Sequence, residues 1–247
     1  MRNFRTLFRR ELATLYYTPT SYVVMCVFLI VVGWLFWILV NYLNAPSKPI
    51  DANVFGYLFG GTFIYWMVVV AAVTSALTMR SFSEEYRSGT IEMLMTTPVT
   101  DTQVVLSKFA AAQTFLMIMW VPTLVYVYVL SRFTTVDMGV VLAGYLGTFL
   151  LNCMLTSLGI MISSTNRSQF VSFFVTFIGI LMLFSLNFMQ DVVSNKWRVV
   201  YRYASVLEQF NPFTKGVISS QSVIYFVSIT LFLLFCTIKS VESRKWR

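Results

Sequence analysis

The stretch RSFSEEYRSGTIEMLMTTPVTDTQVVLSK, residues 80–108, lies between two long runs that contain no Lys, Arg, Asp or Glu. A helix needs about 20 predominantly apolar residues to cross a hydrocarbon core of about 30 Å, and both runs meet that length. The stretch itself is charged and contains one glycine and one proline, Gly89 and Pro98. The sequence therefore predicts two membrane-spanning helices joined by a polar loop.

Four more runs of the same kind lie elsewhere in the chain, so we expect six spans. Strands of a β-barrel would instead alternate in polarity over about 10 residues, which these runs do not do. The predicted fold class is an all-α integral membrane protein with six transmembrane helices. The spans are expected at Tyr22–Val40, Tyr57–Met79, Phe109–Leu130, Met138–Ile162, Phe170–Gln190 and Val217–Ile238.

Composition excludes several classes of protein. Apolar residues make up 57% of the chain, charged residues 11%, and the mean hydropathy is +0.73, whereas about a quarter of the residues in a globular domain carry charge. Six spans leave too few residues for a soluble domain of about 100 residues, so we predict a single six-helix transmembrane domain over residues 1–247. The sequence contains no histidine and no GxxxxGK[ST] loop. We therefore predict no catalytic residue, no cofactor site and no metal site in this chain.

Basic residues predict the orientation, because short cytoplasmic segments are enriched in Lys and Arg. If both termini are cytoplasmic, the inner segments hold twelve basic residues and the outer segments six. The six outer ones are Lys48, Arg132, Lys196, Arg198, Arg202 and Lys215. We thus expect cytoplasmic termini, and we interpret the net charge of +8 as a topology signal and not as nucleic-acid binding.

Two segments outside the spans have amphipathic patterns. Residues 1–20 place apolar side chains at helical spacing opposite four arginines, which predicts an interfacial elbow helix, although a simple basic anchor before the first span is also compatible. Residues 191–216 are too polar to span. We expect one or two short interfacial helices there, on the extracytoplasmic side.

The loop at residues 80–108 divides into two short helical pieces. Ser81 or Ser83 is expected to cap the first, with Glu84 and Glu85 in its first turn, and Gly89 to end it. Residues 90–97 form the second amphipathic piece, and Pro98 stops it. Apolar side chains beside acids are typical of a helix that a partner groove binds, while an inert interfacial loop is the alternative.

The run FSEEYRSGTIEMLMTTPVTDTQVVLSKF resembles the signature of type-2 ABC-transporter permeases. Two further segments, FRRELATLYYTPTSYVVMCVF and KGVISSQSVIYFVSITLFLLFCTIKSVESRKW, resemble the branch that includes the gliding-motility permease subunit. The resemblance implies a coupling helix between spans two and three that docks on a cytoplasmic ATP-binding subunit. Carried over by position, its residues are Glu84, Glu85, Arg87, Ser88, Gly89, Thr90, Glu92, Leu94 and Pro98.

The same resemblance implies the assembly. It implies a second permease copy or a related permease, ATP and Mg in the partner subunit only, location in a bacterial inner membrane, and export as the direction. The substrate path is not assigned to residues. The alternative is a membrane anchor or force-transmitting subunit of an ATP-driven machine, such as a gliding-motility or secretion complex, because the same loop would serve both. An ion-coupled transporter is disfavoured, since none of the six predicted spans contains an ionisable Asp, Glu, Lys, Arg or His.

Overall fold

The computed structural model describes residues 2–43, 63–90, 100–132, 137–189 and 195–244. These residues form long helices and short connections. The helices are α1 (Arg2–Tyr17), α2 (Pro19–Leu43), α4 (Phe63–Thr78), α5 (Ser83–Ser88), α7 (Asp101–Trp120), η2 (Val121–Thr123), α8 (Leu124–Ser131), α9 (Met138–Thr165), α10 (Gln169–Met189), α11 (Asn195–Ala204), α12 (Val206–Thr214) and α13 (Ser220–Arg244).

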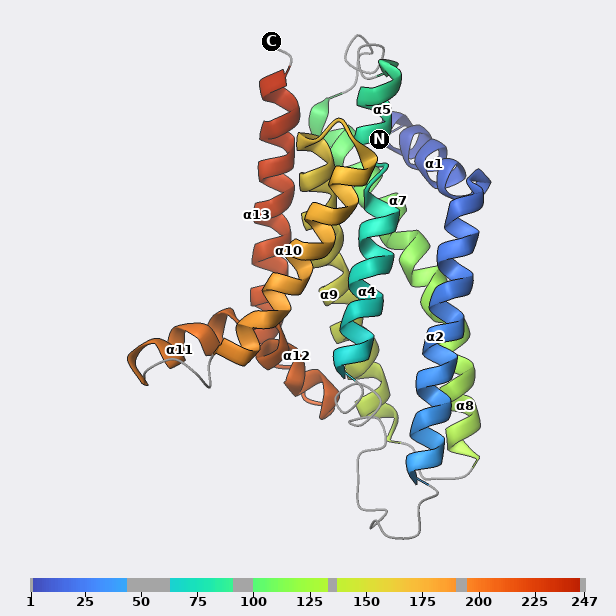
Figure 1. The fold of residues 1–247 in the computed structure, drawn as a ribbon, viewed down its shortest axis with the longest axis vertical. Coiled ribbons are helices and arrows are strands. Elements are labelled where there is room, and N and C mark those ends of the chain that lie inside the picture. Colours follow the sequence, from blue (N-terminus) through green and yellow to red (C-terminus); the bar gives the residue numbers. More distant parts are fainter. Residues whose placement is uncertain (1, 44–62, 91–99, 133–136, 190–194, 245–247) are drawn as a thin grey trace.

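Within the described residues, six helical segments are long and apolar enough to cross a membrane, which confirms the predicted all-α membrane fold. The six segments lie in α2, α4 with α5, α7 with α8, α9, α10 and α13. They stand side by side along the long axis of the molecule (Figure 1). Helices suit this environment because each one satisfies its own backbone hydrogen bonds, which lipid cannot do. The N-terminus and the C-terminus lie near the same end of the bundle, which we call the terminal end.

Helix α1 confirms the predicted elbow as a helix. It crosses the terminal end obliquely and packs along α7 (Figure 1), and Thr18 separates it from α2, which begins at Pro19. Its Leu15 and Tyr16 pack against the main core, whereas Leu7 packs against a smaller cluster around Phe82. The elbow is therefore attached to the bundle through its apolar side.

The third span starts earlier than predicted. Helix α7 begins at Asp101, where the Thr100 hydroxyl accepts a hydrogen bond from the Gln103 amide, and not at Phe109. The helical path then continues through a short 3-10 turn at Pro122 into α8. This extension places Lys108 within the first turns of a long helix, on its buried face with Val104, Val105, Ala111 and Ala112.

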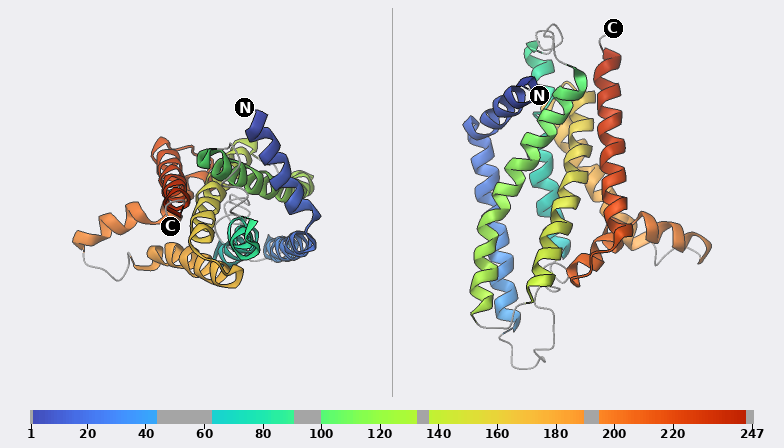
Figure 2. Two further views of the ribbon diagram at one scale, coloured as in Figure 1. Left: turned by 90° about the horizontal axis from the view of Figure 1, so that it is seen from above. Right: turned by 180° about the vertical axis from the view of Figure 1, so that it is seen from behind.

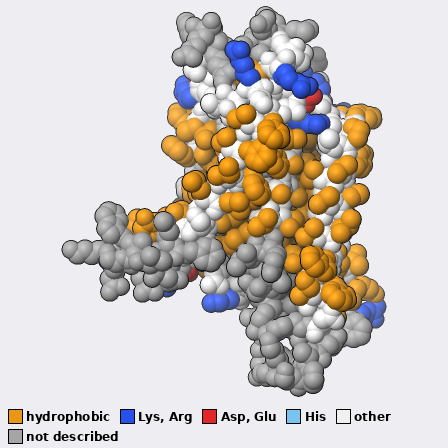
Figure 3. Space-filling view, viewed as in Figure 1, with side chains coloured by type: hydrophobic (Ala, Val, Ile, Leu, Met, Phe, Trp, Pro, Cys, Tyr) orange, Lys and Arg blue, Asp and Glu red, His pale blue; other side chains and the backbone are white. Residues whose placement is uncertain are grey.

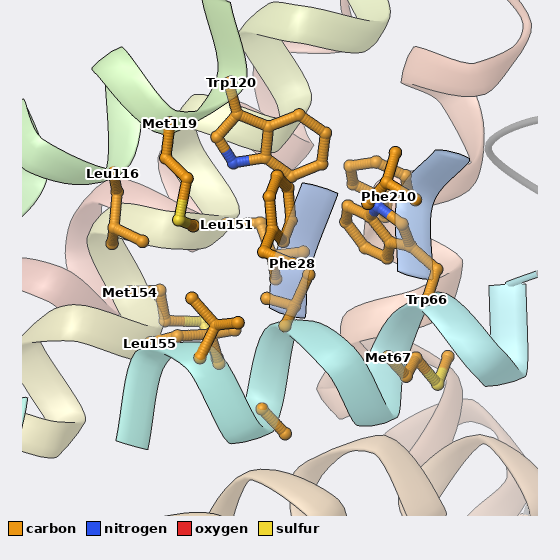
Figure 4. Packing of buried hydrophobic residues seen from close by; sticks show 14 of the residues in the cluster. Phe28, Trp66, Met67, Leu116, Met119, Trp120, Leu151, Met154, Leu155 and Phe210 are labelled. Carbon is orange, nitrogen blue, oxygen red and sulfur yellow. The ribbon is translucent and has the colours of Figure 1, made fainter. Parts of the chain in front are cut away.

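The core lies between α2, α4, α7, α9 and α12. Aromatic rings from four helices meet there, with ring centroids 5.2 Å apart for Phe28 and Trp120, 5.9 Å for Trp66 and Trp120, and 5.7 Å for Trp66 and Phe210 (Figure 4). Helices α4 and α9 approach so closely that a Cβ added at Gly159 would collide with the Thr78 side chain. Small residues permit this kind of approach in membrane bundles, where packing replaces the hydrophobic effect between helices.

Residues 195–214 form two short helices, in agreement with the prediction for this segment. Helix α11 projects sideways from the bundle (Figure 2), whereas α12 packs against the side of α9. Phe210 and Phe213 of α12 are fully buried, because they pack against the core and against Gly147 of α9. The second helix therefore belongs to the core and not only to the surface.

Candidate functional site

Helix α5, Ser83–Ser88, is the described part of the predicted coupling element. A turn at residues 79–82 separates it from α4, and Glu84 and Glu85 lie in its first turn as expected. The helix ends at Gly89, whose φ of 72° is the left-handed conformation that glycine adopts without strain. The chain can therefore change direction immediately after α5.

The predicted serine cap of α5 is wrong. Phe82 occupies the cap position and makes no side-chain capping bond, while the Ser83 side chain is fully buried. A side chain of another helix accepts the hydrogen bonds that a capping serine would accept. The amide groups of Phe82 and Ser83 both donate to Oγ of Ser163 on α9, at 3.1 and 3.2 Å.

Ser163 also connects to the other side of the turn. Its hydroxyl donates to the Met79 carbonyl over 3.1 Å, so one side chain satisfies backbone groups that the break between α4 and α5 leaves without helical partners. The Ser83 hydroxyl lies 2.7 Å from Oγ of Ser172 on α10 and 3.0 Å from the Asn166 carbonyl. The start of α5 is thus hydrogen-bonded to α9, to α10 and to the connection between them.

A buried ion-pair network holds α5 to α1 and α7. Nζ of Lys108 lies 2.7 Å from Oε1 of Glu85 and 3.1 Å from Oε2 of Glu11, and the lysine side chain is only 3% exposed. Arg10, at the surface, also belongs to the network. Its Nη2 lies 2.8 Å from Oε1 of Glu11 and 3.7 Å from Oε1 of Glu85. The ring of Phe82 covers the ammonium group, whose nitrogen lies 5.1 Å from the ring centroid.

The network shifts the pKa of its members on α1. Burial alone would raise the pKa of Glu11, but the charges of Lys108 and Arg10 and their hydrogen bonds outweigh it and lower the pKa below the ordinary value of 4.5. The hydrogen bond to Glu11 raises the pKa of Arg10. Glu11 is therefore a carboxylate at neutral pH, which is the form that the buried lysine requires.

The predicted coupling residues divide into three groups. Glu84, Arg87, Ser88, Gly89 and Thr90 are exposed at the terminal end. Glu85 turns inward to Lys108, with a side chain that is 18% exposed. Glu92, Leu94 and Pro98 lie outside the described residues.

Three residues of this site were not predicted from the sequence, namely Glu11, Lys108 and Ser163. For Lys108 there is a signal, because a charged residue at the start of a long apolar run usually has a buried partner. No local pattern identifies Ser163 or Glu11, since their partners lie about 80 and 97 positions away in the chain.

Comparison with known proteins now adds to this geometry. The sequence model of one protein family, described as ABC-2 family transporter protein, matches residues 19–183, which is more than half of the chain and extends from α2 into α10. No curated protein matches the chain. The narrower likeness to the gliding-motility branch stays a prediction. Because the match covers most of the chain, including α5, α7, α9 and most of α10, this chain belongs to the ABC-2 family of transporter proteins.

Proposed function

We propose that this permease subunit couples ATP hydrolysis by a separate cytoplasmic subunit to export, with two permease copies forming the substrate path between them. ATP and Mg would be bound by the partner alone. The exposed residues of α5, together with residues 91–99, would form the docking surface. The protein would lie in a bacterial inner membrane with both termini in the cytoplasm.

The observation that supports this proposal best is the attachment of α5 to four other helices. Lys108 joins α5 to α7 and, through Glu11, to α1, while Ser163 and Ser172 join it to α9 and α10. A partner that displaced α5 would therefore act on these helices directly. ATP shifts the equilibrium between two conformations only if it binds one of them more tightly, and such a connection lets the difference reach the spans.

Charge supports the proposed orientation. The terminal end carries most of the described basic residues, and Figure 3 shows blue side chains gathered there above an apolar band. The described segments of the terminal end contain ten, namely Arg2, Arg5, Arg9, Arg10, Arg80, Arg87, Lys108, Arg167, Lys239 and Arg244, and those of the opposite end contain five, namely Arg132, Lys196, Arg198, Arg202 and Lys215. Cytoplasmic segments are enriched in Lys and Arg in the same way.

The first experiment is purification of the chain from native membranes in mild detergent, with mass spectrometry of the proteins that accompany it. We expect an ATP-binding subunit with a phosphate-binding loop at a ratio near one to one. Recovery of the intact chain without such a subunit would contradict the proposal.

Glu84 offers the sharper test of docking, because it is exposed and forms no ion pair within the described residues. We expect Glu84→Lys to abolish stimulated ATP turnover in the reconstituted complex, while Lys215→Glu, a charge reversal of the same size and opposite sign near the other end, leaves it unchanged. Glu85→Lys is unsuitable for this purpose, since it would place a second cation against Lys108. Normal turnover in the Glu84→Lys complex would exclude the docking role.

The family match names a transporter and so gives no support to the force-transmitting alternative.

A further inference from the structure

A pocket of about 540 Å³ lies at the terminal end, between α1, the start of α2, the end of α4, α5 and α7. Its volume is within the range of about 300 to 1,000 Å³ that is typical of small-molecule sites. The pocket adjoins the ion-pair network, because Glu11, Glu85 and Lys108 form part of its wall. Its wall also includes Glu84 and Thr90, which belong to the exposed surface that we propose for docking.

The lining of the pocket changes from apolar to polar side chains along the helices, toward the terminal end. Small and apolar side chains on the spans form one part, represented by Val24 on α2, Ala76 on α4 and Ala111 on α7. Charged and hydroxyl side chains nearer the terminal end form the other, among them Arg80 and Thr18. This is the polarity gradient that a membrane amphiphile has, with a polar headgroup above apolar chains.

Of the three cations in this wall, Arg80 is the one without a counter-ion in the part of the chain that the structure describes. The other two cations, Arg10 and Lys108, are paired with Glu11 and Glu85. Arg80 takes part in no ion pair among the described residues, and its Nε is buried without a hydrogen-bond partner there. A buried donor of this kind is rare in proteins and is usually satisfied by a group that binds.

The guanidinium group of Arg80 indicates which chemical class of ligand would bind there. A guanidinium group presents N–H donors in a planar fork that fits the oxygens of phosphate. Basic pockets between membrane helices bind the headgroups of phospholipids in the leaflet that they face. From these contacts we propose that the pocket binds a glycerophospholipid of the leaflet at the terminal end, with its phosphate on Arg80 and the upper part of its chains against Val24, Ala76 and Ala111.

The test uses the full chain purified in detergent and needs no ATP-binding subunit, so its failure would leave the proposed transport role untouched. Thermal unfolding is followed by the fluorescence of the six tryptophans. Three probes separate the sources of binding, namely phosphatidylglycerol, diacylglycerol with the same chains and no phosphate, and glycerol phosphate with no chains. We expect a saturable rise in the unfolding temperature with phosphatidylglycerol alone, because only this probe has both parts.

Substitutions then locate the site. We expect Arg80→Gln to raise the half-saturating concentration of phosphatidylglycerol by about tenfold or more, as the loss of a charged hydrogen bond predicts. The matched control Arg9→Gln removes an exposed arginine of the same end that does not line the pocket, and it should leave the concentration unchanged. Ala76→Leu fills the pocket while keeping Arg80, and it should abolish the response.

Each other outcome overturns the assignment. An equal rise of the half-saturating concentration in Arg80→Gln and Arg9→Gln would show that the lipid is attracted by the net charge of this end and not by Arg80. An unreduced rise of the unfolding temperature in Ala76→Leu would show that the lipid binds outside the pocket. The same rise with glycerol phosphate would indicate a small-anion site, and the same rise with diacylglycerol would indicate an apolar cleft without a phosphate contact.

Discussion

Lys108 forms the central ion pairs that hold α1, α5 and α7 together at the terminal end. A buried ammonium group is strongly destabilising unless it is paired and hydrogen-bonded, and two carboxylates from α1 and α5 meet this need. The pairing explains why a lysine is tolerated inside a helix whose neighbouring side chains are buried. Glu85 belongs to the predicted coupling element. The pairing also explains why its side chain points toward Lys108 and not toward the surface proposed for docking.

We predict that Lys108→Met destabilises the protein by about 3 to 5 kcal/mol, because it removes the buried cation and leaves Glu11 and Glu85 with only the exposed Arg10 beside them. The matched control is Lys239→Met, which removes an exposed lysine 2.7 Å from Glu242 and should change stability by about 1 kcal/mol at most. Denaturant unfolding in detergent micelles measures both. Equal effects of the two substitutions would show that burial adds nothing to the Lys108 pairs.

Acid should weaken the same network in a defined pH range. The folded pKa of Glu11 is lowered, so the stabilisation that its charge provides is present above the ordinary value of 4.5 and is lost as pH falls through the lowered value. At pH 7 we expect Glu11→Gln to be less stable than the natural protein by about 2 kcal/mol, the range for a charged hydrogen bond. Unfolding curves between pH 7 and pH 3 should show this difference narrowing below pH 4.5, and a constant difference would contradict the assignment.

At the scale of elements, the break between α4 and α5 is stable because a third helix satisfies its backbone groups. A buried turn leaves amide and carbonyl groups that water cannot reach and that need partners within the protein. Ser163 of α9 supplies both an acceptor and a donor at this turn. The position of α5 is therefore determined by α9 and α10 as much as by its own sequence.

Ser163→Ala should accordingly lower stability by about 1 to 3 kcal/mol, the penalty for leaving buried amides without an acceptor. Ser157→Ala on the same helix is the control, because Ser157 is equally buried but its hydroxyl donates only to the Met154 carbonyl one turn away. We expect a change of less than about 1 kcal/mol there. Hydrogen exchange of the Phe82 and Ser83 amides should rise in Ser163→Ala alone, and unchanged protection would contradict the capping role.

At the scale of the whole molecule, the six spans bring both termini, α1 and α5 to one end (Figure 1). The basic residues gathered there predict that this end is cytoplasmic. Orientation also decides which leaflet supplies lipid to the pocket beside Arg80 and from which side an ATP-binding subunit reaches α5.

Cysteine labelling tests the orientation directly. In a background where Cys26, Cys153 and Cys236 are replaced by alanine, Lys215→Cys should react with a membrane-impermeant maleimide in intact cells. Arg9→Cys should react only after the cells are permeabilised. The opposite pattern would place the termini outside and would remove the cytoplasmic docking surface.

Sequence alone determined the number of spans, the class of fold and the position of the short helix α5 after the second span. Each of these depends on local properties, because about 20 apolar residues in a row suffice for a span and the motif at residues 83–90 is contiguous. Gly89 is an example, since it ends α5 as the sequence predicts.

The tertiary structure alone decided what these residues contact. Ser83 turns inward to Ser163 and Ser172 instead of capping its helix, and Glu85 turns inward to Lys108 instead of facing a partner. Helix α12 likewise enters the core through Phe210 and Phe213, although its sequence is that of a short amphipathic helix. The physical reason is that a buried polar or aromatic side chain is stable only beside its partner, and these partners come from distant segments that only folding brings together.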